Sequence, residues 1–166
     1  MIAIREEQAA DIVAIRVLNT RTFGQPREAD IVDTIRSHDN ALLSLVATAD
    51  YDVVGHILYS PASIGDVRGA ALGPMAVLPA FQRQGIGSTL VEHGNQQMKD
   101  AGQPFIIVLG HAAFYPRFGF LPGSRRGITC EWNVPDSAFM VLVLDEPRMR
   151  GVRGLAKYSD EFWSIE

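Results

Sequence analysis

Residues 72–88 read LGPMAVLPAFQRQGIGS, and this stretch decides the fold. An apolar strand ends near Val77, a loop follows, and a helix is predicted from about Gly87. The free backbone N–H groups at the start of that helix converge at its positive end, where a phosphate is stabilised. Gly85 and Gly87 let the backbone approach an anion closely, and Arg83 adds a full positive charge. A tight strand-to-helix turn without any ligand is the alternative that these residues alone leave open.

Two nucleotide-binding motifs do not match this loop. The dinucleotide-binding pattern Gly-x-Gly-x-x-Gly has Leu90 at its third glycine position, and the Gly-Lys-Ser/Thr of a P-loop is missing. The loop therefore predicts a phosphate ligand of another kind.

Around this stretch, the hydrophobic periodicity predicts alternating helices and strands. Helices are predicted over Glu6–Asn19, from Pro26 onward, over Gly87–Ala101 with Gly102 as C-cap, and over Ala112–Arg117. Strands are predicted over residues 1–4, Ala41–Thr48, Val53–Ser60, Val67–Val77, Phe105–Leu109 and, as the final strand, Ala138–Leu144. Turns are predicted at Ala49–Asp52 and Pro61–Gly65, and Gly73-Pro74 should distort its strand. Together these elements predict an α/β fold with a mixed sheet.

The composition of the whole chain is typical of a soluble globular protein. Its 166 residues are 47% hydrophobic and 20% charged, which fits one domain and excludes disorder, collagen and coiled coil. A formal net charge of −4 provides no basic field for nucleic acid or an anionic membrane. The single cysteine, Cys130, excludes an internal disulfide and a cysteine-rich zinc site. No signal peptide or membrane-spanning stretch is recognised, so we expect a cytoplasmic protein.

Three ordered motifs resemble the GNAT superfamily of N-acetyltransferases, and in particular its bacterial YhbS-like branch. Gln82–Gly87 matches the Gln/Arg-x-x-Gly-x-Gly/Ala signature, Leu72–Pro79 precedes it, and Phe114–Phe120 (FYPRFGF) follows the next predicted strand. The resemblance implies a single GNAT domain over residues 1–166. Its central sheet would be mixed, mostly antiparallel, twisted and flanked by helices, with two strands splayed apart to form a cleft for acetyl-CoA.

The same resemblance implies roles for individual residues. The backbone of Met75, Ala76 and Val77 would pair with the pantetheine arm, and an N–H near Ala76 would form a modest oxyanion site. The pyrophosphate would be held by the amides of Gln82, Arg83, Gln84, Gly85, Ile86, Gly87 and Ser88. Tyr115 would be the general acid that protonates the CoA sulfur while an amine attacks the thioester directly.

Other candidate residues are weaker. Glu28 and His111 are candidates for the acceptor site, although each also fits a plain helix-start position. Many relatives carry an asparagine where Gly110 and His111 stand. His56 alternates with apolar residues and is interpreted as a core histidine, and Cys130 as a free buried thiol. No metal-ligand spacing is present.

The sequence leaves the function open in several respects. A catalytically silent acyl-CoA-binding sensor or partner module is the main alternative to an enzyme, and Tyr115 favours the enzyme. A longer or different acyl group is a third option. The amine acceptor is not identified. The sequence does not give the oligomeric state either; dimers are common in the superfamily, so a homodimer is one option.

Overall fold

The computed structural model describes residues 1–163, which divide into two compact units. Unit 1 comprises Met1–Ser60, Gly73–Gly94 and the segment from Asp160 onward, and unit 2 comprises Pro61–Leu72 and Asn95–Ser159. Two strands (Asp52–Ile64 and Val67–Val77) and one helix (Ile86–Asp100) contribute residues to both units, because the unit boundaries fall inside these elements.

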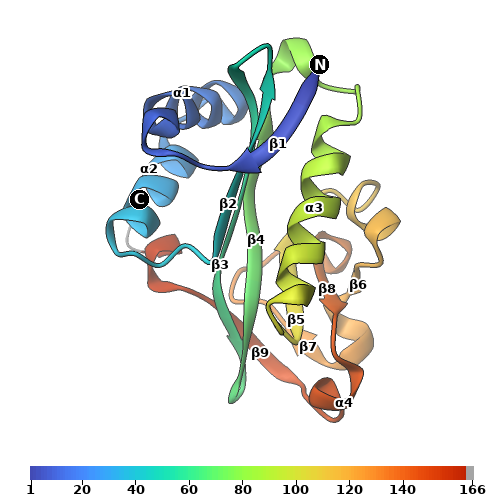
Figure 1. The fold of residues 1–166 in the computed structure, drawn as a ribbon. Helices are drawn as coiled ribbons and strands as arrows, with labels where there is room; N and C mark the ends of the chain where they lie inside the picture. The colour runs from blue at the N-terminus through green and yellow to red at the C-terminus, as the bar shows by residue number, and fades with distance from the viewer. Residues whose placement is uncertain (164–166) are drawn as a thin grey trace. The chain divides into compact units, whose positions relative to one another are not determined.

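The elements of the fold are shown in Figure 1. The strands are β1 (Ile2–Glu6), β2 (Leu43–Ala49), β3 (Asp52–Ile64), β4 (Val67–Val77), β5 (Phe105–Leu109), β6 (Leu121–Pro122), β7 (Ile128–Thr129), β8 (Phe139–Val143) and β9 (Gly154–Tyr158). The α-helices are α1 (Ile12–Phe23), α2 (Arg27–Ser37), α3 (Ile86–Asp100) and α4 (Glu146–Met149). Short 3-10 helices lie at Ala9–Asp11, Pro79–Phe81, Tyr115–Phe118, Gly123–Arg126, Asp136–Ala138 and Asp160–Phe162.

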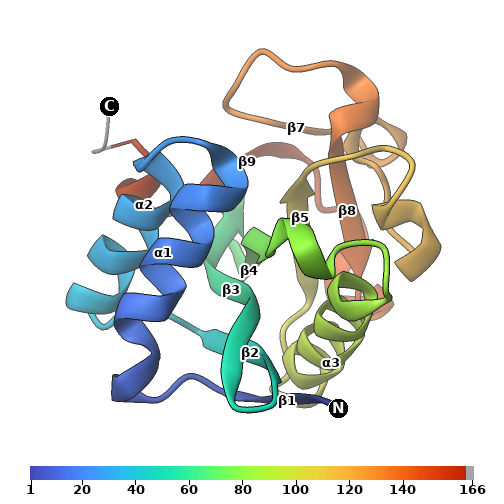
Figure 2. The ribbon, with the colours of Figure 1, turned by 90° about the horizontal axis from the view of Figure 1, so that it is seen from above.

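In unit 1, the strands follow the order β1-β2-β3-β4, and helices lie on both faces. Figure 2 shows α1 and α2 side by side next to β2 and β3, with the start of α3 on the other side. Val46 and Leu58 pack with Ile15, Ile31, Val32 and Ile35 of α1 and α2. The opposite face carries Gly55, where an added Cβ would lie 3.1–3.2 Å from Leu90 and Ile86 of α3. Successive residues of a strand point to opposite faces, which explains this division.

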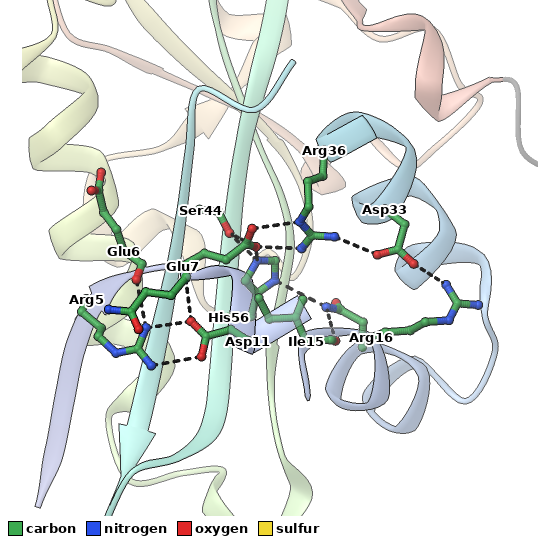
Figure 3. A network of polar contacts seen from close by, with 12 residues as sticks. Arg5, Glu6, Glu7, Asp11, Ile15, Arg16, Asp33, Arg36, Ser44 and His56 are labelled. Carbon is green, nitrogen blue, oxygen red and sulfur yellow. Dashed lines mark hydrogen bonds and ion pairs between the residues drawn. The ribbon is translucent and has the colours of Figure 1, made fainter. Parts of the chain in front are cut away.

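A chain of polar contacts crosses unit 1 (Figure 3). Ser44 donates its hydroxyl hydrogen to Glu7 Oε1 at 2.8 Å and accepts from His56 Nε2 at 2.9 Å. His56 Nδ1 then accepts from the Asn19 side-chain amide at 3.4 Å. Arg36 holds the other end of the chain, with Nη2 2.7 Å and Nε 2.8 Å from the Glu7 carboxylate.

The environment of His56 explains its protonation state. The predicted position in the core is confirmed, because the side chain is fully buried (0% exposed). Burial lowers the pKa of His56 to about 4; Glu7 partly opposes this shift and Arg36 adds to it. The pKa of Glu7 is lowered by hydrogen bonds from Arg36 and Ser44, which outweigh the opposing effect of its burial. The neutral imidazole therefore serves as a packing and hydrogen-bonding group at neutral pH.

Residues 160–162 return to unit 1 and close its core. Phe162 packs against the apolar cluster beneath α1 and α2, and its carbonyl accepts from Arg27 at 3.1 Å. The Glu161 carboxylate is only 4% exposed and lies 3.0 Å from His38 Nδ1 and 3.2 Å from Asn40 Nδ2. Phe162 is thus partly buried, whereas Trp163 is half exposed.

Unit 2 is built around β5, whose Phe105, Ile106, Ile107 and Val108 are all buried. β5 pairs in parallel with β4 through Ala71 and Ile107, and antiparallel with β8 through Ile107 and Val141. β8 also pairs with β6, while β9 pairs antiparallel with β3 and in parallel with β7. The buried apolar run that predicted a strand at 105–109 is therefore confirmed.

Several predicted boundaries are wrong. Pro61–Gly65 is not a turn, because β3 continues to Ile64 and pairs with β9; only Gly65 and Asp66 turn the chain. The first helix begins at Ile12 after a 3-10 turn and runs to Phe23, where Gly24 (φ 70°) caps it. The predicted helix at 112–117 is a 3-10 helix over Tyr115–Phe118.

The predicted final strand, Ala138–Leu144, corresponds to β8, but β9 follows it. The predicted distortion at Gly73-Pro74 is confirmed by the backbone of Gly73, whose φ is 143°. No helix among residues 1–163 is long and apolar enough to cross a membrane.

Candidate functional site

The candidate phosphate-binding loop lies in unit 1, between the end of β4 and the start of α3. A 3-10 turn at Pro79–Phe81 leads into Gln82, which is extended (φ −69°, ψ 157°). Arg83 and Gly85 both have a positive φ, 63° and 85°. This backbone conformation favours glycine at position 85, because a side chain would strain it. Crowding is not the reason, since nothing lies within 4 Å of an added Cβ.

Residues 82–85 are solvent-exposed, and Ile86, the first residue of α3, is buried at 3% exposure. This buried residue anchors the helix, so that its N-terminal N–H groups face the exposed loop. Thr89 closes the first turn by donating both its backbone N–H (3.0 Å) and its hydroxyl (2.9 Å) to the Gly85 carbonyl. Arg83 adds a cation beside the positive end of a 15-residue helix. The geometry predicted from the sequence is thus present: a Gly-bearing loop, a helix start and a positive charge.

The strand before the loop is tied to it by a side chain. Gln82 Nε2 donates to the Val77 carbonyl at 2.9 Å, and Thr22 of α1 donates to the same oxygen at 3.4 Å. The N–H of Leu78 donates to Val54 of β3 at 2.9 Å. These bonds fix the end of β4, whose Ala76 and Val77 are buried and whose Met75 is partly exposed. Thr22 is a residue that sequence reasoning missed, since its contact joins segments that are far apart in the chain.

Tyr115 lies in unit 2 at the start of a 3-10 helix and is 6% exposed. Its ring makes edge contacts with Phe114 (centroids 5.0 Å apart) and Phe120 (5.7 Å). Burial raises the pKa of Tyr115 to about 12, so the phenol is protonated at neutral pH. A Cβ added at Gly110 would overlap the Tyr115 ring. Gly110 therefore provides the space that this ring occupies, a role that the sequence did not reveal.

Other titratable groups surround Tyr158, a second buried tyrosine of unit 2. Burial raises the pKa of Tyr158, and Cys130, Tyr115 and Glu131 raise it further. Glu131 accepts from the Tyr158 backbone N–H at 2.7 Å, and the Trp132 ring lies edge-on to the Tyr158 ring. Sequence reasoning missed Tyr158, because β9 was not predicted. Alternation of buried Ala156 and Tyr158 with exposed Lys157 was the available signal.

The weaker candidates have ordinary local surroundings. Glu28 lies in the first turn of α2 and accepts from Gln25 Nε2 at 3.0 and 3.2 Å. His111 is exposed, and its carbonyl accepts from the N–H groups of Phe114 and Tyr115. Cys130 is a free thiol, but it is partly exposed and not buried as predicted; the burial that it has raises its pKa. Within the described part of the chain, no group of three His, Cys, Asp or Glu side chains is placed to hold a metal ion.

Comparison with known proteins places this geometry in a family. The model of the "Acetyltransferase (GNAT) family" matches residues 12–120. The chain is 33% identical over 162 residues to the uncharacterized N-acetyltransferase YhbS of Escherichia coli K12, covering 96% of this chain and 97% of YhbS. It is 35% identical over 134 residues to the uncharacterized N-acetyltransferase YjhQ of the same organism, covering 76% of this chain and 74% of YjhQ.

Solved structures agree with these sequence matches. The crystal structure of Escherichia coli YhbS in complex with CoA matches with a TM-score of 0.92 and 31% identity, over 97% of this chain and 91% of that one. A GNAT family acetyltransferase from Brucella melitensis in complex with acetyl-CoA matches with a TM-score of 0.81 and 33% identity, over 98% of both chains. By sequence and by structure, the chain belongs to the GNAT acetyltransferase family and has its fold, a mixed, mostly antiparallel sheet flanked by helices.

Proposed function

We propose that this chain, an acetyl-CoA-dependent N-acetyltransferase, moves the acetyl group directly to a primary amine. The observation that carries the proposal is the exposed loop at 82–85, which leads into the start of α3 with Gly85 at φ 85°. Two relatives that match over nearly the whole chain were solved with CoA and acetyl-CoA. Their ligands support acetyl-CoA as the co-substrate here.

The pyrophosphate is held, in this proposal, by the backbone N–H groups of residues 82–88. A phosphate fits this loop because the space beside Gly85 is open and Arg83 and the helix end are both positive. Met75, Ala76 and Val77 pair with the pantetheine arm through their backbone. The Val77 carbonyl already accepts from Gln82 and Thr22, so Met75 and Ala76 supply more of this pairing.

In the transfer step, a neutral amine attacks the thioester carbonyl carbon; a C–N bond forms and the C–S bond breaks. Free amines have a pKa near 10, so the amine loses a proton before attack and a second one as the amide forms. The departing thiolate gains one proton. The N–H near Ala76 stabilises the transient oxyanion.

Tyr115 hydrogen-bonds to the departing sulfur in this scheme and transfers the proton to it. A phenol with a pKa of about 12 is a weaker acid than a thiol, which titrates near 8.5. Tyr115 therefore acts as a relay: it hands its proton to the sulfur and regains one from the positively charged nitrogen of the intermediate. Glu28 and His111 are proposed to lie on the acceptor side.

The cofactor part of the proposal is tested by thermal unfolding with acetyl-CoA. A ligand that binds only the folded protein raises the melting temperature. We expect this stabilisation in the wild type and in Gly85→Asn, because asparagine tolerates a positive φ. We do not expect it in Gly85→Asp, because aspartate has a side chain of similar size that carries a negative charge. Gly24→Asp, at a similar φ of 70° outside the loop, is the matched control and should keep the response. Equal stabilisation by ATP would contradict the CoA assignment.

The catalytic part is tested with Tyr115→Phe, which removes only the hydroxyl. Thiol release with a panel of primary amines should fall by about 10²–10⁴-fold in kcat, while acetyl-CoA binding stays unchanged. An unchanged kcat would remove Tyr115 from the mechanism. If the wild type binds acetyl-CoA but turns over no amine, the chain is the silent acyl-CoA-binding module.

The proposal has three further parts: the chain works as a single acetyltransferase domain, it acts in the cytoplasm, and it forms a homodimer. Sedimentation equilibrium of the purified protein tests the dimer, and a single mass of about 18 kDa would contradict it.

A further inference from the structure

Unit 2 contains a solvent-open basic pocket of about 580 Å³ that shares no residue with the sites proposed above for acetyl-CoA and the acceptor. Two segments form it: the end of the 3-10 helix Gly123–Arg126, and the stretch from α4 to the start of β9. Its lining residues, here called the arginine pocket, are Arg125, Arg126, Glu146, Met149, Arg150, Gly151, Val152 and Arg153.

The charge of the arginine pocket is unusual for this chain. Four arginines and one glutamate line it, in a protein whose formal net charge is −4. Arg126 is neutralised by Glu146, with Nη2 2.7 Å from Oε1. Within residues 1–163, the guanidinium groups of Arg125, Arg150 and Arg153 have neither a hydrogen bond nor an ion pair. Three unpaired cations around one cavity repel one another, and an anion would relieve that repulsion.

The backbone beneath these arginines is well ordered by its own contacts. Met149 is buried at 2% exposure, and its carbonyl accepts from the Val152 N–H at 3.1 Å. The N–H of Gly154 donates to the Gly127 carbonyl at 2.9 Å, where β9 pairs with β7. This bond joins the segment carrying Arg125 to the segment carrying Arg150. The two sets of arginines are therefore held together by the sheet and not by a chance approach of loops.

We propose that the arginine pocket binds a small ligand that carries phosphate groups. Guanidinium groups bind phosphate oxygens in a bidentate geometry, and several of them match a group that bears more than one negative charge. A volume of about 580 Å³ lies within the range of roughly 300–1,000 Å³ that is usual for small-molecule sites. The overall negative charge disfavours an extended nucleic acid. The pocket shares no residue with the loop proposed to hold the CoA pyrophosphate.

The test is a calorimetric titration of the full chain with inorganic pyrophosphate at constant ionic strength. Arg150→Gln combined with Arg153→Gln should weaken the binding at least about tenfold, because the variant loses two guanidinium groups that would form charge-assisted hydrogen bonds to the phosphate oxygens. The matched control combines Arg21→Gln with Arg68→Gln. It removes the same charge from exposed arginines outside the pocket and should bind as the wild type does. The Gly85→Asp variant should also retain the binding, which separates this site from the CoA loop.

Four results would overturn the proposal. They are no pyrophosphate binding by the wild type, equal weakening in the pocket and control variants, loss of binding in Gly85→Asp, and weaker CoA binding in the pocket variant. A parallel arm uses phosphatidylglycerol vesicles. If the wild type binds these vesicles but not pyrophosphate, the arginines contact a membrane surface and the proposal of a small-molecule site is wrong.

Discussion

The buried histidine of unit 1 makes the protein sensitive to mild acid. His56 has a folded-state pKa of about 4, whereas an unfolded histidine titrates near 6.5. Between these two values the unfolded chain binds the extra proton and the folded chain does not. Stability therefore rises with pH across this window, and it is lost as pH falls from 6.5 towards 4.

The size of this effect follows from the two pKa values. The difference amounts to about 3 kcal/mol in all, of which about 2 kcal/mol is lost between pH 7 and pH 5. That is a large part of the roughly 5–15 kcal/mol by which a typical domain is stable. Glu7 and Asp11 have lowered pKa values, and stability from them is lost only as pH falls below their ordinary range near 4. The window from pH 7 to pH 5 thus separates the effect of His56 from that of these two carboxylates.

The measurement is urea unfolding at pH 7, 6 and 5, for the wild type and His56→Gln. The glutamine amide can still bond to Ser44 but does not titrate, so its stability should change about 2 kcal/mol less over this range. Other histidines affect both proteins equally and cancel in the comparison. Equal slopes would refute the reasoning. If the variant does not fold, the NMR titration of His56 in the wild type decides, since a midpoint above pH 6 also contradicts it.

Two further predictions concern unit 2. Gly110→Ala should displace the Tyr115 ring, destabilise the protein by about 1–3 kcal/mol in urea unfolding and lower kcat. The control Gly151→Ala, at an exposed position, should leave kcat unchanged. A wild-type kcat in Gly110→Ala would show that the position of the Tyr115 ring does not matter for catalysis. The Cys130 thiol, whose pKa is raised by burial, should react with iodoacetamide more slowly than a free thiol at pH 7.5, and an equal or faster rate would contradict this prediction.

Features with a local chemical cause could be predicted from the sequence. Pro26 precedes α2, Gly102 (φ 80°) follows α3, and the buried apolar run at 105–109 forms β5. In each case the residue itself restricts the backbone or demands burial. The loop at 82–87 was predicted for the same reason, because glycine spacing and a helix start are readable locally.

The missed features depend on partners that are distant in the sequence. Residues 62–64 of β3 pair with β9, which lies more than ninety residues later in the chain. β7 has only two residues, and it is a strand only because it pairs with β9. Thr22 beside Val77 is a similar case, since a contact between segments that are far apart in the chain leaves no local pattern.

The return of residues 160–162 to unit 1 has a consequence for synthesis. A ribosome makes the chain from its N-terminus, so all of unit 2 emerges before Glu161 and Phe162 do. Until then, the apolar cluster beneath α1 and α2 lacks its contact with Phe162, and His38 and Asn40 lack their carboxylate partner. The contacts of unit 1 are therefore complete only after residues that follow the whole of unit 2 in the sequence have been added.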